Sequence, residues 1–193
     1  MLIIFLGVGM LVYPFIENNM EDLFVKYKDE LKDGLRYMVL RAELLDNRSL
    51  YNGRLGMMII FFEYSRYKGD SLFERFAEEM LDAYELPDTL SWRFDDGMAG
   101  IGWGIVYLLS RKFIEGDVND ILFDLDKKML EDAGVKYEDR KGVWTYLAYR
   151  RRYAIENRIV FPLVSVWNHW RKENISLDEE SRVLNTIWNS CSK

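Results

Sequence analysis

The chain has 193 residues, of which 49% are hydrophobic and 30% charged, and its formal net charge at neutral pH is −6. This composition predicts a soluble globular protein whose core needs no disulfide or metal. The acidic balance argues against a nucleic-acid partner, whose phosphates require a basic face. The single cysteine, Cys191, excludes an intramolecular disulfide and any zinc site built on several thiolates.

The first sixteen residues are almost wholly apolar. No Lys or Arg precedes this run, no small-residue cleavage site follows it, and a transmembrane helix needs about 20 apolar residues. A buried helix over 5–17 is therefore a better interpretation than a signal peptide or a membrane anchor. We expect a cytoplasmic protein without a membrane partner, in which this helix belongs to a repeat unit that lacks its opening turn.

Apolar residues recur at three- and four-residue steps along most of the chain, which predicts an all-α fold. Gly69 and Gly116 are expected at left-handed helix ends, and Asp70 and Asp117 are expected to cap the helices that follow. The expected helices are 5–17, 20–32, 35–45, 53–67, 71–84, 97–112, 118–132, 141–156, 160–172 and 177–189.

A glycine-bracketed turn occurs twice, as Asn-Gly-Arg-Leu-Gly at 52–56 and as Asp-Gly-Met-Ala-Gly at 96–100, so that the two copies are offset by 44 residues. Each turn opens an apolar helix, and an amphipathic helix follows. A fixed period of this size is typical of stacked helix pairs. The repeat predicts hairpin units near 50–94 and 94–134 within one helical domain covering residues 1–193.

Residues 94–108 (Phe-Asp-Asp-Gly-Met-Ala-Gly-Ile-Gly-Trp-Gly-Ile-Val-Tyr-Leu), followed by Phe-Ile-Glu-Gly-Asp at 113–117, resemble the lanthionine synthetase C-like family. Members of that family carry a repeated Gly-x-x-Gly motif at the start of each inner helix. Residues 51–56 are similar, and the resemblance covers at least residues 50–128. It implies an α/α toroid in which inner-helix N-termini surround a cavity. Because complete members are much longer, this chain would form a partial or open toroid.

Active members of that family bind zinc through two cysteines and one histidine, in a Trp-Cys-x-Gly segment and a Cys-His-Gly segment. This chain has neither segment. Its single histidine, His169, is flanked by Asn168 and Trp170, and Cys191 lies between two serines. We therefore expect no zinc-dependent cyclase activity, no metal and no cofactor. The resemblance implies a non-catalytic protein that binds a peptide or a partner protein in the maturation of a ribosomally made peptide.

Two other functions stay open. A zinc-independent enzyme of the α/α-toroid type, for example a carbohydrate-active one, would use Asp95 or Asp96 as acid or base. Alternatively, the chain is a fragment of a larger toroid, which upstream residues or a second copy in a homodimer would complete. The match between Asp96 and Asn52 in the two turns favours a helix N-cap over acid–base chemistry, because a cap tolerates asparagine.

The candidate ligand-binding residues belong to or lie near the two turns. Their aromatic members would either line the cavity or fill the core between inner helices, and burial tendencies favour the core. The set is Tyr51, Asn52, Trp92, Asp95, Asp96 and Trp103.

The run Arg150, Arg151 and Arg152 is the candidate surface for an acidic protein or leader peptide. Three consecutive helical residues point in three directions, so a solvated or intramolecular role is the favoured alternative.

Overall fold

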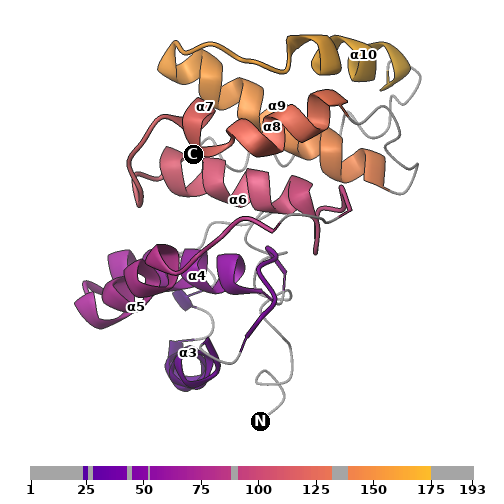
Figure 1. Cartoon of the computed structure of the whole chain (residues 1–193). Helices are drawn as coiled ribbons and strands as arrows, with labels where there is room; N and C mark the ends of the chain where they lie inside the picture. Colours follow the sequence, from indigo (N-terminus) through magenta and orange to yellow (C-terminus); the bar gives the residue numbers. More distant parts are fainter. Residues whose placement is uncertain are drawn as a thin grey trace. The chain divides into compact units, whose positions relative to one another are not determined.

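The computed structural model describes residues 24–25, 28–42, 45–51, 53–87, 91–131 and 139–174. Within these ranges the regular elements are helices, which confirms the predicted all-α class (Figure 1). The described residues fall into two compact units, one ending before residue 90 and one starting after it. The helices predicted at 5–17 and 177–189 lie outside the described residues.

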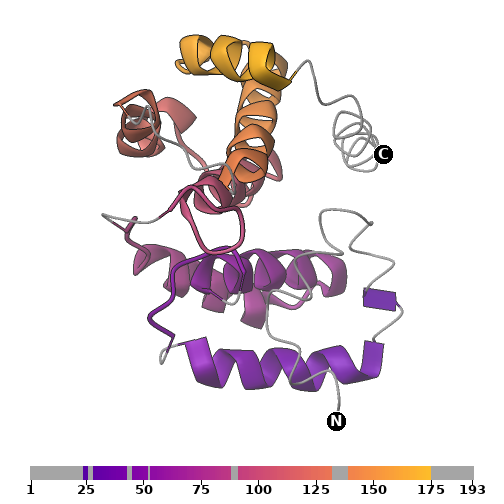
Figure 2. The ribbon, with the colours of Figure 1, turned by 90° about the vertical axis from the view of Figure 1, so that its right-hand side faces the viewer.

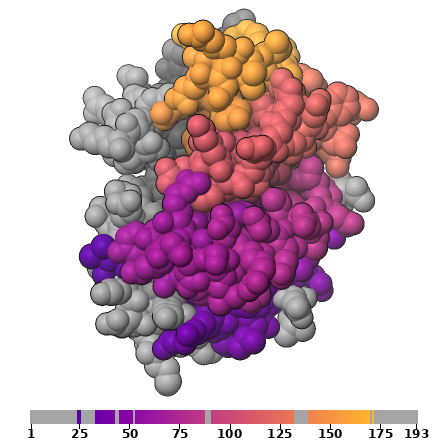
Figure 3. Space-filling model, turned by 90° about the vertical axis from the view of Figure 1, so that its left-hand side faces the viewer, coloured from indigo at the N-terminus to yellow at the C-terminus, as the bar shows by residue number. Residues whose placement is uncertain are grey.

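Among its described residues, the first unit contains the helices α3 (Lys28–Ala42), α4 (Arg54–Lys68) and α5 (Ser71–Asp82). Helix α4 is buried along most of its length, whereas α5 buries the single stripe Phe73, Ala77 and Met80. Rings from both helices interlock, because Phe73 lies 5.7 Å from Phe61 and 5.0 Å from Tyr64 between ring centroids. Helices α4 and α5 therefore form the expected hairpin of a buried and an amphipathic helix. Residues of this hairpin, coloured purple to magenta, make up much of the first unit's surface on the face drawn in Figure 3.

The turn between α4 and α5 has the predicted chemistry. Gly69 is left-handed, with φ of 66°, and its amide donates to the Ser65 carbonyl at 2.7 Å. The Asp70 carboxylate then accepts from the amide of Leu72 at 3.1 Å. Both the C-terminal glycine and the N-cap are confirmed.

Helix α3 is continuous in Figure 2, and its range includes Gly34, so the predicted separation of 20–32 from 35–45 was wrong. A glycine inside a helix costs about 1 kcal/mol relative to alanine, which is too little to end a helix that buries an apolar residue such as Leu35.

The second unit contains five helices among its described residues. They are α6 (Met98–Ser110), α7 (Val118–Ile121), α8 (Phe123–Glu131), α9 (Arg140–Asn157) and α10 (Val164–Asn174). Helix α6 is the buried helix of this unit, and it packs closely on α9 at Gly102. A Cβ atom there would lie 2.5 Å from the ring of Tyr146, so only glycine allows this approach.

Three boundaries differ from the prediction in this unit. The amphipathic helix predicted at 118–132 is interrupted at Leu122. The left-handed residue after α6 is Lys112, with φ of 58°, rather than the expected Gly116. Gly116 lies in the loop before Asp117, which is confirmed as the N-cap of α7. Helix α10 begins at Val164 rather than at 160, because Pro162 favours an extended conformation in the residue before it.

The repeat seen in the sequence is also a repeat of backbone structure. The amide of Arg54, the first residue of α4, donates to the carbonyl of Asn47 at 2.8 Å. At the equivalent place in α6, the amide of Met98 donates to the carbonyl of Ser91, also at 2.8 Å. Each partner lies 44 residues from its counterpart, so both hairpins begin with the same loop closing onto the first turn of the buried helix.

The glycines before these helices are required by the closeness of the loop. A Cβ atom on Gly53 would lie 2.2 Å from the Ser49 carbonyl oxygen, and one on Gly97 would lie 2.3 Å from the Ser91 carbonyl oxygen. Both glycines are extended, so steric exclusion rather than a left-handed conformation accounts for them.

Candidate functional site

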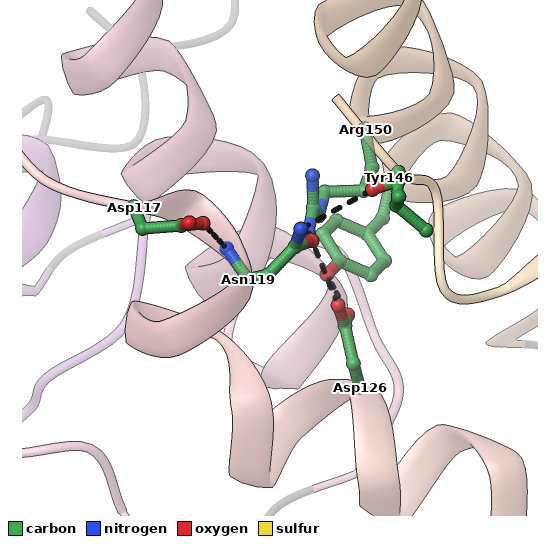
Figure 4. A network of polar contacts seen from close by, with 6 residues as sticks. Asp117, Asn119, Asp126, Tyr146 and Arg150 are labelled. Atoms are coloured by element: carbon green, nitrogen blue, oxygen red, sulfur yellow. Dashed lines mark hydrogen bonds and ion pairs between the residues drawn. The ribbon is translucent and has the colours of Figure 1, made fainter.

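A buried polar cluster lies between α7, α8 and α9 of the second unit (Figure 4). Tyr146 and Arg150 stand one turn apart on α9, so both side chains point to the same neighbour. The Tyr146 hydroxyl donates to Oδ1 of Asp126, on α8, at 2.5 Å, and Arg150 Nη2 lies 3.4 Å from Oδ2 of the same carboxylate. Arg150 Nη2 also donates to Oδ1 of Asn119, on α7, at 2.5 Å. The cluster therefore ties both short helices to α9.

Burial dominates the electrostatics of this cluster. Burial raises the pKa of Asp126, while the Tyr146 hydroxyl and the Arg150 guanidinium oppose that rise. Burial, followed by the adjacent Asp126 carboxylate, raises the pKa of Tyr146 well above its ordinary value. Both carboxylate oxygens of Asp126 are already engaged, which suits a structural tie between helices.

Arg150 was a candidate for partner binding, and the structure corrects that prediction. Its side chain is fully buried and forms an ion pair with Asp126. A surface partner cannot reach it while α7 and α8 are in place. Its Nε and Nη1 atoms are buried and make no hydrogen bond in the structure.

The other two arginines of the run lie elsewhere, as the helical geometry predicts. Arg151 is exposed, and its guanidinium carbon lies 5.0 Å from the centre of the Trp167 ring. Arg152 Nε donates to Glu156 on the same helix at 2.5 Å. The favoured intramolecular interpretation therefore describes Arg150 and Arg152, while Arg151 remains accessible.

Trp103 is buried and packs against three half-buried aromatic side chains. Its ring stacks on Tyr107 at 5.2 Å and lies 5.7 Å from Phe94 and 5.3 Å from Tyr149. Trp92 is also buried. These positions agree with the core interpretation of Trp103 and Trp92.

The adjacent carboxylates do not cap α6. The N-cap of α6 is Gly97, and no side chain accepts from the first turn there. Asp96 is exposed and instead forms an ion pair with Arg93, with Oδ1 3.2 Å from Nε. Asp95 is half-buried. The N-cap prediction for Asp96 was therefore wrong, because the loop carbonyl of Ser91 already accepts the first helical amide.

The remaining candidates are placed only in part. Tyr51 is half-buried in the first unit, and its carbonyl accepts from the Ser49 hydroxyl at 2.6 Å. Asn52 and Cys191 lie outside the described residues. His169 is exposed on α10. Within the described ranges, no three His, Cys, Asp or Glu side chains gather as metal ligands.

Sequence reasoning missed Asp126, Tyr146 and Asn119. The four-residue spacing of Tyr146 and Arg150 was available as a signal of a shared helix face. Their shared partner Asp126 lies twenty residues before Tyr146 and 24 residues before Arg150, and nothing in the local sequence pairs them.

Among the described helices, none is long and apolar enough to cross a membrane. The comparisons with family models, curated proteins and solved structures found no match to this chain.

Proposed function

We propose that this chain is a non-catalytic, lanthionine synthetase C-like protein that binds a peptide or a partner protein. The observation that carries the proposal is the repeated loop-to-helix turn that opens both hairpins. The Arg54 amide bonds to the Asn47 carbonyl, and 44 residues later the Met98 amide bonds to the Ser91 carbonyl in the same way. Helical-repeat proteins keep the buried contacts of each repeat constant, and they bind partners through the exposed side chains that differ between repeats.

One of the two carboxylates that would serve catalysis is engaged in an intramolecular contact, which supports a binding role. Asp96 is paired with Arg93, and the buried Asp126 is likewise held by Tyr146 and Arg150. A general acid or base must instead be within reach of a substrate proton.

The proposal extends to assembly and location. Helices α4 and α6 would be inner helices of a partial α/α toroid in the cytoplasm, and a second copy would complete it as a homodimer. The ligand would be a ribosomally made peptide or a protein that acts on one.

Selection of random peptides displayed on phage, with the purified chain as bait, tests the binding role. We expect enriched peptides that bind with one-to-one stoichiometry and a Kd of about 1 μM, which corresponds to about −8 kcal/mol. Mass spectrometry after prolonged incubation should recover these peptides unchanged. A chain that enriches no peptide, or that modifies the bound one, would contradict the proposal.

A further inference from the structure

One segment of this acidic protein carries a net positive charge. Residues 139–174 contain eight Lys or Arg and three Asp or Glu, a net charge of +5. The rest of the chain, with 18 basic and 29 acidic residues, carries −11. The described helices of the segment are α9 and α10, which lie against each other in Figures 1 and 2.

Two tryptophans join these helices at the surface. The Trp144 ring of α9 stacks on the Trp167 ring of α10, with centroids 4.6 Å apart and planes inclined by 12°. Arg151 lies over the Trp167 ring, and both tryptophans are only half-buried. Partly exposed Trp and Arg are the residue types that contribute most to binding at protein interfaces.

Further exposed side chains extend this group along both helices. On α9, four residues at successive spacings of three, seven and four positions lie along one side of the helix. On α10, three residues at successive spacings of three and four positions do the same. Ile155 and Val164 are apolar members that remain 59% and 53% exposed. We call this set the basic aromatic face: Lys141, Trp144, Arg151 and Ile155 on α9, and Val164, Trp167 and Arg171 on α10.

The cations of the basic aromatic face are available for an external anion. Lys141, Arg151 and Arg171 are exposed, and no carboxylate in the described part of the chain forms an ion pair with any of them. The neighbouring Arg150 and Arg152, in contrast, are paired with Asp126 and Glu156. The face therefore carries three exposed positive charges around a tryptophan pair.

We infer that the basic aromatic face binds an acidic peptide segment that also carries large apolar side chains. This inference rests on the proposed function and names its ligand class. Peptide carboxylates would pair with Lys141, Arg151 and Arg171, and an apolar side chain would pack on the exposed parts of Trp144 and Trp167. A nucleic acid fits less well, because the chain as a whole has a net charge of −6.

Fluorescence anisotropy with three labelled synthetic peptides tests this inference. The first repeats Glu-Asp-Leu-Phe, the second replaces both acids by Lys, and the third replaces Leu-Phe by Ser-Ser. We expect the first peptide to bind, to weaken at high salt, and to bind more tightly than the other two.

Charge-reversing variants locate the site. Arg151→Glu and Lys141→Glu should each weaken binding of the acidic peptide about tenfold, a loss of about 1.4 kcal/mol. Arg75→Glu is the matched control, since Arg75 is exposed on α5 in the first unit and carries the same change of charge. Circular dichroism of each variant verifies that the helices are retained, and Lys141→Glu keeps the test valid should Arg151→Glu fail to fold.

Equal binding of the lysine peptide, or unchanged affinity in both face variants, would overturn the inference. If phage-selected peptides bind elsewhere, the inference fails while the proposed function stands. If no peptide binds, both fail. Light scattering on the free chain tests whether a second copy of the chain, rather than a peptide, occupies the face. A salt-sensitive dimer that is lost in Arg151→Glu would assign the face to a second copy and overturn the peptide proposal.

Discussion

The buried pair of Asp126 and Arg150 is the residue-scale feature with the largest expected effect on stability. Each charge is out of water, and each compensates the other. Removing one partner of such a pair leaves an uncompensated buried charge, and that costs more than the intact pair contributes.

Asp126→Asn should therefore lower the free energy of unfolding of the second unit by about 3–5 kcal/mol. Urea denaturation followed by tryptophan fluorescence measures this effect. Asp124→Asn is the control, because Asp124 is exposed on the same helix and should change stability by less than about 0.5 kcal/mol. Equal stability of the two variants would show that Asp126 is not a structural tie.

Two tyrosines predict loss of stability at alkaline pH. Burial raises the pKa of Tyr84, whose hydroxyl donates to the Arg48 carbonyl at 2.7 Å, and burial raises the pKa of Tyr146. A group whose pKa is higher in the folded state contributes stability that is complete below its unfolded pKa, here about 10, and is lost above it.

The free energy of unfolding should consequently fall as the pH rises above about 10. Tyr146→Phe and Tyr84→Phe should each reduce this fall, measured as urea midpoints against pH. The same alkaline loss in the double variant would assign the effect to other groups.

At the scale of elements, the two loop-to-helix turns are held by glycines that exclude any side chain. Gly97 faces the Ser91 carbonyl at a distance that no Cβ atom tolerates, whereas a Cβ atom on Gly34 in α3 would meet nothing within 4 Å. The two glycines therefore have opposite expected responses to alanine.

Gly97→Ala should destabilise the second unit by about 1–3 kcal/mol or more, since the loop must move away from α6. Gly34→Ala should stabilise α3 by about 1 kcal/mol, because alanine has the higher helix propensity. Thermal unfolding of both variants measures the contrast. A neutral Gly97→Ala would mean that the loop adapts without cost.

At the scale of the whole molecule, the proposed toroid and its binding role predict the metal content and the molecular mass of the protein in solution. Elemental analysis of the purified chain should find no stoichiometric zinc, because the family's cysteine and histidine segments are missing from the sequence. Light scattering should give twice the mass of one chain if a second copy completes the toroid. Stoichiometric zinc would contradict the non-catalytic proposal, and a monomer would contradict the homodimer.

Most of the helical structure was predictable because its causes are local. The expected helices 53–67, 71–84, 97–112 and 141–156 match α4, α5, α6 and α9 within two residues at each end. Asp70 and Asp117 cap as expected, because an N-cap depends on a side chain and an amide two residues later.

The sequence by itself determined the all-helical class, the hairpin turns and the 44-residue repeat, since periodicity and turn chemistry act over a few residues. Only the tertiary structure decided which polar residues are buried. Arg150 was a candidate for a partner surface, yet Asp126 and Asn119, which precede it by more than twenty residues, enclose it. Asp96 looked like a helix cap, yet the Ser91 carbonyl accepts the first helical amide and leaves Asp96 to pair with Arg93. Such contacts depend on which segments meet in space, and that is set by the packing of the helices around each residue.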